Sequence, residues 1–540
     1  MLHPRPDIIP GTIHLVNTDS GHAGRDETIV LNPTPSADPE DPLNWSRPRK
    51  LLNIAMVYIY VFGIGIATTV QYSILTNISE DTGIPLADLN TGTGLMFLFA
   101  GWGCLLWQPI ALSYGRRGVY LLSSLLCIGP MVWTAYTTSK GAWWAHRILI
   151  GLFVAPVESL PEVSVPDLFF AHERGNYMGF YSFALFGSNA LAPLLAGFIT
   201  QYMEWKAAIW FGTIVVSVTT VIIFFGMEET LYFRSTIEGA SEDPADTLAA
   251  QKIGHDETNE KSASEELRQD PVTPDVGVAS ESRTYLQKLH LFRLLPNRPT
   301  VKQTFVMMYR PLQIFFLFPN VVWAGFLYGA SLCLYQVGNA TVGFVLGGPG
   351  YGWGADMVGL SYICGIIGSL VGWVYSGWGA DRLTIWLATR NKGIREPEQR
   401  LWILVPSAFI SGGGLILWGV GAAHQVHFMG LMFALAFLNF GIVVGATTGI
   451  SYNVDCFKDI AGETLILVMI IRNTMGYAMA FGITPWLNTS GLQNTFIGTA
   501  FLYLGCTFTF LFMTVWGRRL RKMCARRYYR FAETTIVPHT

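Results

Sequence analysis

The feature that most constrains this chain is a series of long apolar segments with almost no charge. A bilayer core about 30 Å thick is crossed by a helix of roughly 20 mostly apolar residues. Only 13% of the 540 residues are charged, against roughly 25% in an ordinary soluble domain. The chain therefore predicts an all-α polytopic membrane protein whose spans lie near residues 51–74, 91–113, 118–137, 143–166, 176–202, 207–227, 311–337, 357–378, 401–422, 427–450, 462–485 and 495–517.

The spans form two sets of six, which predicts five regions along the chain. They are a cytoplasmic, largely disordered tail (1–50), an N-terminal six-helix bundle (51–227), a cytoplasmic central loop (228–310), a C-terminal six-helix bundle (311–517) and a basic cytoplasmic tail (518–540). From Ala240 to Arg283 the loop is acidic and poor in aromatic residues, so we expect it to be disordered. Tyr285–Arg310 mixes apolar and basic residues, which favours an amphipathic helix on the membrane surface.

The distribution of Lys and Arg predicts the orientation. With a cytoplasmic N-terminus, the outer loops hold only Lys140 and Lys206, and nearly all other bases near the spans lie inside. Positive charge accumulates on the cytoplasmic side of membrane proteins, so both termini are expected there. Glycosylation sequons at Asn77, Asn339 and Asn488 fall in predicted outer loops, where an acceptor asparagine has to lie.

Each half carries a small residue and charged residues in the loop after its second helix. They are Gly115, Arg116, Arg117, Gly377, Asp381 and Arg382. A small residue allows close helix approach, and the charges can pair with neighbouring helix ends to hold one conformation. The correspondence indicates a duplication, and two parallel halves would enclose a central cavity. The alternative is that Arg116 and Arg117 only satisfy the positive-inside rule.

This arrangement resembles the major facilitator superfamily, whose loop pattern is G-x-x-x-D-R-x-G-R-R. The first half departs from it, since Leu112 and Ser113 stand where the Asp-Arg pair belongs. The resemblance implies the major facilitator fold, with six plus six helices in two pseudo-symmetric bundles. It also implies alternating access to one site near the middle of the membrane.

Two further motifs lie within the predicted spans. Arg147-x-x-x-Gly151 resembles the R-x-x-x-G motif of the family, and a buried arginine there should face the bundle interior and have a partner. The run Gly187–Gly197, which includes Pro193, is similar to a motif associated with proton-linked exporters. Its small residues allow close packing and bending. Plain helix packing is the alternative.

Several strings resemble fungal members of the twelve-helix drug:proton antiporter family. They are P-S-A-D-P-E-D-P-L-N-W (35–45), H-E-R-G-x-Y-M-G (172–179), M-E-E-T-L-Y (227–232) and P-E-x-R-L (397–401). The run from Glu158 to Phe170 further resembles the branch that holds the polyamine and histidinol permeases. This likeness covers nearly the whole chain and implies coupling to protons.

Charged side chains inside a span are costly beside lipid, so they should line a cavity. Arg147, Glu158 and Glu162 lie within about 60° of one another on the fourth helix at 100° per residue. A desolvated carboxylate could exchange its proton for a cationic substrate. Alternatively, both carboxylates pair with Arg147 or with loop bases. Arg472, in the eleventh helix, could bind an anionic group or pair with a carboxylate of the other half.

Further cavity candidates are polar or aromatic residues on other spans, because sites for amphiphilic molecules mix aromatic and polar groups. They are Asn189, Trp323, Tyr328 and Asn439. The sequence contains no Walker-type G-x-x-x-x-G-K-[ST] motif for ATP, and no constellation of catalytic residues or metal ligands. We therefore expect neither an enzyme nor a cofactor nor a metal site.

Three functional hypotheses follow. The first is a proton-coupled secondary transporter that exports a drug or secondary metabolite. The second is proton-coupled uptake of polyamines or other organic cations, and the third is a membrane receptor that does not transport. The expected partners are a small molecule, protons and lipid, whereas a net charge of −2 speaks against nucleic acid. We expect a monomer in the plasma membrane.

Overall fold

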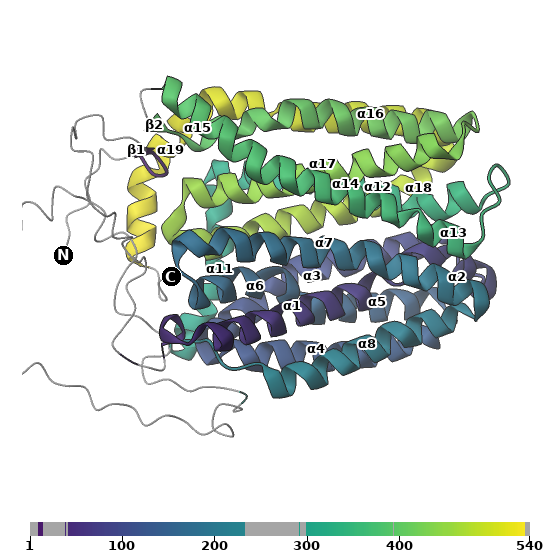
Figure 1. Ribbon diagram of the computed structural model, residues 1–540, viewed down its shortest axis with the longest axis horizontal. Helices are drawn as coiled ribbons and strands as arrows, with labels where there is room; N and C mark the ends of the chain where they lie inside the picture. The colour runs from purple at the N-terminus through teal and green to yellow at the C-terminus, as the bar shows by residue number, and fades with distance from the viewer. Residues whose placement is uncertain are drawn as a thin grey trace, which may run out of the picture.

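The computed structural model describes residues 9–14, 38, 41–232, 291, 299–391 and 394–534. The chain forms two bundles of long helices that lie side by side, coloured purple to blue and green to yellow in Figure 1. Among the described residues, eleven segments are long and apolar enough to cross a membrane. The last, Lys458–Ala532, breaks at Gly491, whose φ of 74° is not helical, so it crosses twice. The predicted all-α fold with six plus six spans is confirmed.

The first bundle contains α1 (Arg47–Thr69), α2 (Leu75–Thr82), α3 (Leu86–Tyr114), α4 (Arg116–Ala135), α5 (Lys140–Val154), α6 (Pro156–Leu168), α7 (Ala171–Tyr202) and α8 (Trp205–Gly226). The second contains α12 (Pro319–Gly347), α13 (Ala355–Leu360), α14 (Tyr362–Val374), α15 (Ala380–Arg390), α16 (Leu404–Ala423), α17 (Phe428–Cys456), α18 (Ala461–Phe508) and α19 (Phe510–Glu533). A connecting helix, α11 (Val301–Leu317), precedes the second bundle.

The start of the second bundle differs from the sequence-based expectation. The seventh span was expected from residue 311, but α11 ends at Leu317 and the spanning helix α12 begins at Pro319. Pro319 lacks a backbone N–H, which suits the first position of a new helix. Of the amphipathic helix expected over 285–310, the described part lies in the first half of α11, whose start is fixed by a capping box of Thr300 and Gln303.

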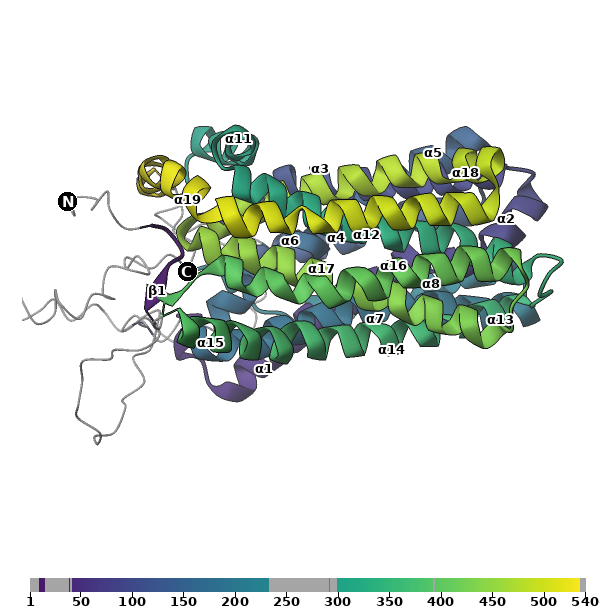
Figure 2. The same ribbon diagram turned by 90° about the horizontal axis from the view of Figure 1, so that it is seen from above.

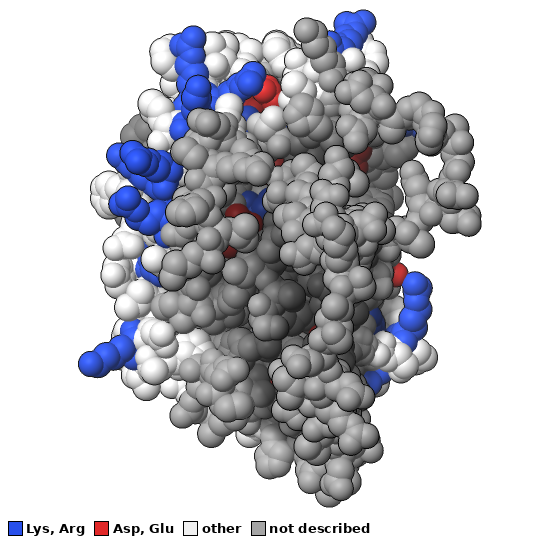
Figure 3. All heavy atoms as spheres, turned by 90° about the vertical axis from the view of Figure 1, so that its left-hand side faces the viewer, with Lys and Arg blue, Asp and Glu red and all other residues white. Residues whose placement is uncertain are grey.

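Both termini of the described chain lie at one end of the bundles (Figure 1). We call this the basic end, because Lys and Arg side chains stand around its rim in Figure 3, and the opposite end the far end. In Figure 2, α11 and the end of α19 lie across the basic end. There α11 contacts both bundles: Thr304 and Ser113 of α3 share a hydrogen bond of 3.0 Å, and Arg310 pairs with Glu463 of α18 at 2.9 Å.

A short piece of the N-terminal tail is ordered against the second bundle. Strand β1 (Ile13–His14) pairs antiparallel with β2 (Ile394–Arg395). Beside it, the fully buried guanidinium of Arg521 donates to both carboxylate oxygens of Glu398, at 2.9 and 2.6 Å, and to the carbonyl oxygen of Pro10. The tail was expected to be largely disordered, so this contact is a departure from the prediction. The acidic stretch of the central loop lies outside the described residues.

The bundles meet along two seams lined by small residues. At the first, between α3 and α18, a Cβ added to Gly101 would lie 2.7 Å from the Cβ of Asn473. At the second, near the far end, a Cβ on Gly197 of α7 would lie 2.3 Å from the carbonyl oxygen of Ala355 and 2.9 Å from the Cα of Gly359. Small residues permit such close approach of helix backbones. The seams bring the start of α6 opposite the first half of α18.

Candidate functional site

The centre of the interface between the bundles holds an ion pair. Arg472 of α18 donates from Nη2 to Oε1 of Glu158 on α6. The neighbouring Asn473 donates from Nδ2 to the other carboxylate oxygen at 2.7 Å. Glu158 is 7% exposed and Arg472 is 4% exposed. The pair is therefore desolvated, and its carboxylate is bound on both oxygens by the opposite bundle.

Tyr328 of α12 completes the surroundings of the arginine. Arg472 donates from Nη1 to the Tyr328 hydroxyl oxygen at 2.6 Å, and its Cζ lies 4.7 Å from the centre of the ring. Its Nε and Nη2 also donate to the Asn473 side-chain oxygen, at 3.3 and 3.0 Å. A buried charge is tolerated only when it is paired and hydrogen-bonded, and here each guanidinium nitrogen has an acceptor.

This ion pair borders a small cavity of about 20 Å³, which we call the charged cavity. It is lined by Glu158, Glu162, Tyr181, Leu185, Phe186, Tyr328, Ala446, Thr447, Ile450, Met469 and Arg472. Within the described part of the chain, no hydrogen bond reaches the second carboxylate, Glu162. Two carboxylates face one guanidinium, so with both ionised the lining carries a net charge of −2 + 1 = −1. Such a site attracts a proton or an organic cation.

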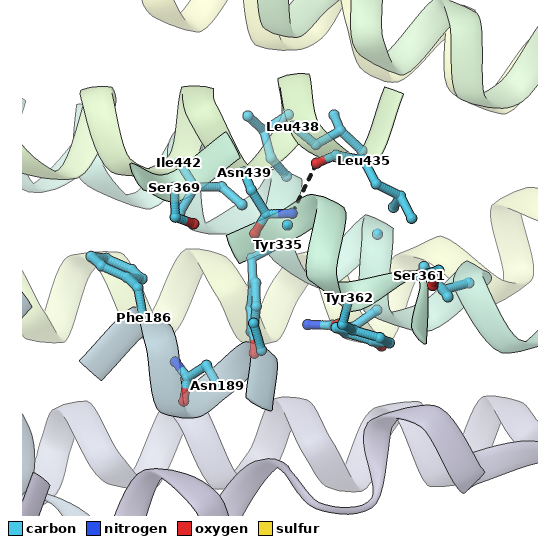
Figure 4. Close-up of a pocket in the computed structure, with 16 residues that line it drawn as sticks. Phe186, Asn189, Tyr335, Ser361, Tyr362, Ser369, Leu435, Leu438, Asn439 and Ile442 are labelled. Carbon is cyan, nitrogen blue, oxygen red and sulfur yellow. Dashed lines mark hydrogen bonds between the residues drawn. The ribbon is translucent and has the colours of Figure 1, made fainter. Parts of the chain in front are cut away.

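A second cavity, of about 30 Å³, shares the residue Phe186 with the first, and Figure 4 shows the residues that line it. Phe186 and Asn189 project into it from α7, Tyr335 points toward them from α12, and Asn439 approaches from α17. Asn439 donates from Nδ2 to the carbonyl oxygen of Leu435 at 2.9 Å. None of the described residues that line this cavity is charged, so we call it the neutral cavity.

The structure divides the predicted cavity residues into three groups. Glu158, Glu162, Tyr328 and Arg472 line the charged cavity, and Asn189 and Asn439 line the neutral one. Trp323 lines neither, since it donates from Nε1 to the Thr509 hydroxyl oxygen at 2.9 Å and packs edge-on against Tyr452.

Arg147 lines neither of these two cavities. It precedes Glu158 by eleven positions, which is about 16 Å along the span at 1.5 Å per residue, so a shared helix face does not bring it to the charged cavity. Arg147 is fully buried beside Trp143, with its Cζ 4.4 Å from the ring centre. Its three side-chain nitrogens have no hydrogen-bond partner among the described residues, although a polar partner was expected. Its motif partner Gly151 packs against the backbone of Met96.

The loop motif of the first half uses acids from elsewhere in the chain. Gly115 has a φ of 122°, a conformation that favours glycine. Arg116 pairs with Asp167 at the end of α6. Glu229 accepts from the backbone N–H groups of Arg116 and Arg117, at 2.9 and 3.0 Å, and so caps the start of α4. These contacts supply the negative charge that the motif itself lacks in this half.

The loop motif of the second half is more exposed. Asp381 pairs with Arg400 at 3.0 Å, and its side chain is 63% exposed. Arg382 lies over the Trp378 ring, with its Cζ 3.8 Å from the ring centre. Gly377 lies in a short π-helical turn between α14 and α15, a local widening often found at functional sites.

In the fifth span, Pro193 and Gly197 lie at the far-end seam between the bundles. The Pro193 carbonyl oxygen accepts a hydrogen bond from Ser73 at 2.7 Å, and it would lie 3.0 Å from a Cβ on Gly359. The predicted close packing of this run is therefore present, between α7 and α13. Whether it bends during a transport cycle stays a prediction.

One of the three predicted glycosylation sites, Asn339, does not lie in an outer loop. Asn339 lies inside α12, is 8% exposed and accepts a hydrogen bond from Tyr362 at 3.0 Å. The helix continues to Gly347, beyond the expected end at 337, so Asn339 lies in the interior instead of an outer loop. Asn77 is half-buried in α2, and Asn488 is exposed near the kink of α18.

Among the cavity residues that the sequence analysis did not single out are three aromatic ones: Tyr181, Phe186 and Tyr362. Helical periodicity could have identified two of them, Tyr181 and Phe186. Tyr181, Leu185 and Asn189 follow one another at intervals of four residues, so they share one face of α7 with Phe186 beside them. Tyr362 carried no such signal, because its place depends on the break between α13 and α14 at Ser361.

Two six-helix bundles around a buried polar interface are the architecture of a membrane transporter. The sequence profile described as Major Facilitator Superfamily matches residues 57–458, and the chain belongs to this superfamily. The prediction of a transporter and not an enzyme is thereby confirmed, and the receptor alternative is set aside.

Fungal relatives extend over nearly the whole chain. An uncharacterized MFS-type transporter of Schizosaccharomyces pombe is 28% identical, covering 97% of this chain and 94% of the relative. Protein HOL1 of Saccharomyces cerevisiae is 26% identical, covering 97% of each chain. The efflux pump vrtL of Penicillium aethiopicum is 22% identical over 93% of this chain and 92% of its own.

Solved structures agree with the fold. A peptide transporter POT in complex with sulfate matches with a TM-score of 0.58 at 12% identity, covering 87% of this chain and 96% of its own. The human organic anion transporter MFSD10 matches with a TM-score of 0.52 at 14% identity, covering 85% and 99%. At these identities the likeness concerns the fold alone.

Proposed function

We propose that this chain is a proton-coupled secondary transporter that exports a small, positively charged organic molecule by alternating access. The observation that carries the proposal is the pair of carboxylates, Glu158 and Glu162, in a buried cavity between the bundles with one arginine facing them. A cavity with one more carboxylate than guanidinium groups favours a bound cation. When no substrate cation is bound, a proton can neutralise the extra carboxylate instead.

Competition at Glu158 gives a coupling mechanism. The carboxylate of the first bundle is held by Arg472 and Asn473 of the second, so its ionised form ties the bundles together. When a proton neutralises Glu158, the attraction for the guanidinium is lost and the bundles can separate. A substrate cation at Glu162 disfavours a proton on the neighbouring Glu158, because two positive charges in one small cavity repel each other, so the cation and the proton compete.

The direction of export is supported by two observations. A relative over most of the chain is described as an efflux pump, and the run with Pro193 and Gly197 resembles that of proton-linked exporters. The second candidate is proton-coupled uptake of polyamines or other organic cations, which the two carboxylates also favour. Both candidates need the same cationic site.

The orientation is part of the proposal. Lys and Arg side chains stand around the rim of the basic end (Figure 3), which favours a cytoplasmic position for that end and for both termini. The close packing of Gly197 on Ala355 and Gly359 holds α7 against α13 at the far end, which supports a conformation closed toward the outside. We propose the plasma membrane as its location, and a monomer as the working unit, since one chain supplies both sides of the cavity.

Reconstituted vesicles test the coupling. The protein is inserted into vesicles that contain a pH-sensitive dye, and spermidine or a cationic drug is added on one side. We expect substrate-dependent proton movement in the opposite direction, abolished in Glu158→Gln and retained in Glu396→Gln. Glu396 pairs with the exposed Arg518 at 3.1 Å and lines neither cavity, so it is a matched control.

Wild-type transport with unchanged pH dependence in Glu158→Gln would overturn the proposal. Direction is tested separately in cells that express the chain and receive radiolabelled spermidine. Saturable accumulation would favour uptake over export, and reduced accumulation relative to cells without the chain would favour export.

A further inference from the structure

We infer that the neutral cavity binds the uncharged end of the substrate, so that the substrate is elongated, with a cationic group at one end and a neutral hydrogen-bonding group at the other. This inference rests on the proposed function, which assigns the cation to Glu158 and Glu162. It adds a second compartment with its own chemistry and thereby narrows the class of substrate.

The two cavities follow one another along the interface, and the side chain of Phe186 lines both. On α7, Tyr181 faces the charged cavity and Asn189 the neutral one. On α12 the corresponding residues are Tyr328 and Tyr335. Both helices run from the basic end toward the far end, so the neutral cavity lies nearer the far end.

The spacing on these helices sets the length of the ligand. Seven residues separate Tyr328 from Tyr335, and at 1.5 Å per residue their backbones lie roughly 10 Å apart along the axis. On the antiparallel α17 the order is reversed, as it must be: Asn439 lines the neutral cavity and Thr447 the charged one. We expect an extended molecule to place one end in each compartment, with the Phe186 side chain, which lines both, moving to admit it.

The neutral cavity presents polar groups whose hydrogen bonds are poorly made. The Asn339 side-chain nitrogen and the Tyr335 hydroxyl are buried next to each other, and neither makes a hydrogen bond of normal geometry among the described residues. A buried polar group without a partner is unfavourable, and a ligand that supplies the partner is favoured by that difference. An amide nitrogen donates only, so the complementary ligand atom is an acceptor, such as a hydroxyl, carbonyl or ether oxygen.

A second positive charge is disfavoured in this compartment. Among the described lining residues the polar groups are amides and hydroxyls, beside apolar walls such as Leu334 and Leu438. An ammonium group placed there would be desolvated with no carboxylate to compensate it. The cavity pair therefore favours an amino alcohol over a diamine of the same length.

Gly338 offers a way to fill the neutral cavity selectively. It lines the cavity, and a Cβ built on it would meet no atom within 4 Å. A side chain at this position thus begins in open space, and the larger Gly338→Leu side chain extends from there into the cavity. Gly413 is the matched control, because it lies on an exposed face of α16 and an added Cβ there also meets nothing within 4 Å.

The test measures binding, which requires no knowledge of direction. Purified protein in detergent is titrated with aminopropanol, aminohexanol and amino-octanol, and with the diamines of the same chain lengths, while thermal unfolding is followed by tryptophan fluorescence. We expect affinity for the amino alcohols to rise at least tenfold from the shortest to the longest, and the longest diamine to bind at least tenfold more weakly than its amino alcohol.

The variants separate the two compartments. Gly338→Leu should abolish the gain with chain length and leave aminopropanol binding unchanged, Gly413→Leu should behave as the wild type, and Glu158→Gln should weaken every amine. Equal binding of long diamines and amino alcohols, or an unchanged gain in Gly338→Leu, would overturn the second compartment alone. If no amine binds, or if Glu158→Gln binds all of them as the wild type does, the cationic site fails and the inference fails with it.

Discussion

Arg472 of α18 and Glu158 of α6 form a buried ion pair although 314 residues separate them in the chain. They belong to different bundles, so the pair is an interaction between the two halves of the transporter. Burial removes both charges from water at a cost comparable to their attraction. The pair is therefore expected to contribute little net stability while making each partner dependent on the other.

A double-mutant cycle tests this dependence. Glu158→Gln and Arg472→Met each leave a buried charge without its partner, which costs about 3–5 kcal/mol. The double variant removes both charges, so it should unfold at a higher temperature than the less stable single variant. Unfolding in detergent followed by fluorescence measures this. Additive losses in the double variant would contradict the expectation, and the exposed Arg518–Glu396 pair serves as a control that should contribute only about 0–1 kcal/mol.

The role of Tyr328 can be divided between its hydroxyl and its ring. Tyr328→Phe removes the acceptor of the 2.6 Å hydrogen bond from Arg472 and should cost about 1–3 kcal/mol, because a buried donor loses its partner. Tyr328→Leu also removes the ring face beside the guanidinium, worth about 0.5–2 kcal/mol more. We expect the stability order wild type, Phe, Leu. Equal stability of the two variants would mean that the ring contributes nothing.

The far-end seam predicts a contrast between two glycines of one helix. In Gly197→Ala the new Cβ would lie 2.3 Å from the Ala355 carbonyl oxygen, whereas in Gly187→Ala it would meet nothing within 4 Å. Forcing α7 from α13 costs about 1–3 kcal/mol, and each 1.4 kcal/mol shifts an equilibrium roughly tenfold. Transport in vesicles should therefore slow roughly tenfold or more in Gly197→Ala and stay near the wild-type rate in Gly187→Ala. Similar rates in both variants would exclude a role for the seam.

Two adjacent glutamates after α8 should differ in their contribution to stability. Glu229 accepts two backbone N–H groups at the start of α4, and losing such a cap costs about 0.5–2 kcal/mol. Glu228 pairs with the half-exposed Arg49 at 2.6 Å, and a pair near the surface contributes about 0–1 kcal/mol. Glu229→Gln should thus lower the unfolding temperature more than Glu228→Gln. The reverse order would show that the cap is not the main role of Glu229.

Local sequence patterns predicted the features that depend on a single helix, namely the spans and the buried charged residues. Hydropathy gave the spans, and the cost of charge in lipid pointed to Glu158, Glu162 and Arg472 as cavity residues. The pairing of Arg472 with Glu158 could not be derived from either helix alone, because it depends on how α18 and α6 are placed. Periodicity did not place Arg147 in the charged cavity, since it predicts the face of a helix and not the depth along it.

The prediction for Asn339 failed for a different reason. The sequon at Asn339 indicates an exposed residue only if the helix has already ended. However, α12 continues for eight more residues after Asn339, to Gly347. The polar residues Gln336 and Asn339 are buried in a stretch that reads as the end of a span. A polar cavity near the end of a helix has the same sequence signature as a loop.

The connecting helix α11 has a geometric consequence for the motion of the whole molecule. It is bonded through Thr304 to α3 of the first bundle and through Arg310 to α18 of the second. These are the two helices of one seam, so any widening of that seam at the basic end must stretch or break one of the two contacts. The distance by which the bundles can separate at the basic end is thus limited by these two side-chain contacts. The length of the chain that connects the bundles does not change this limit.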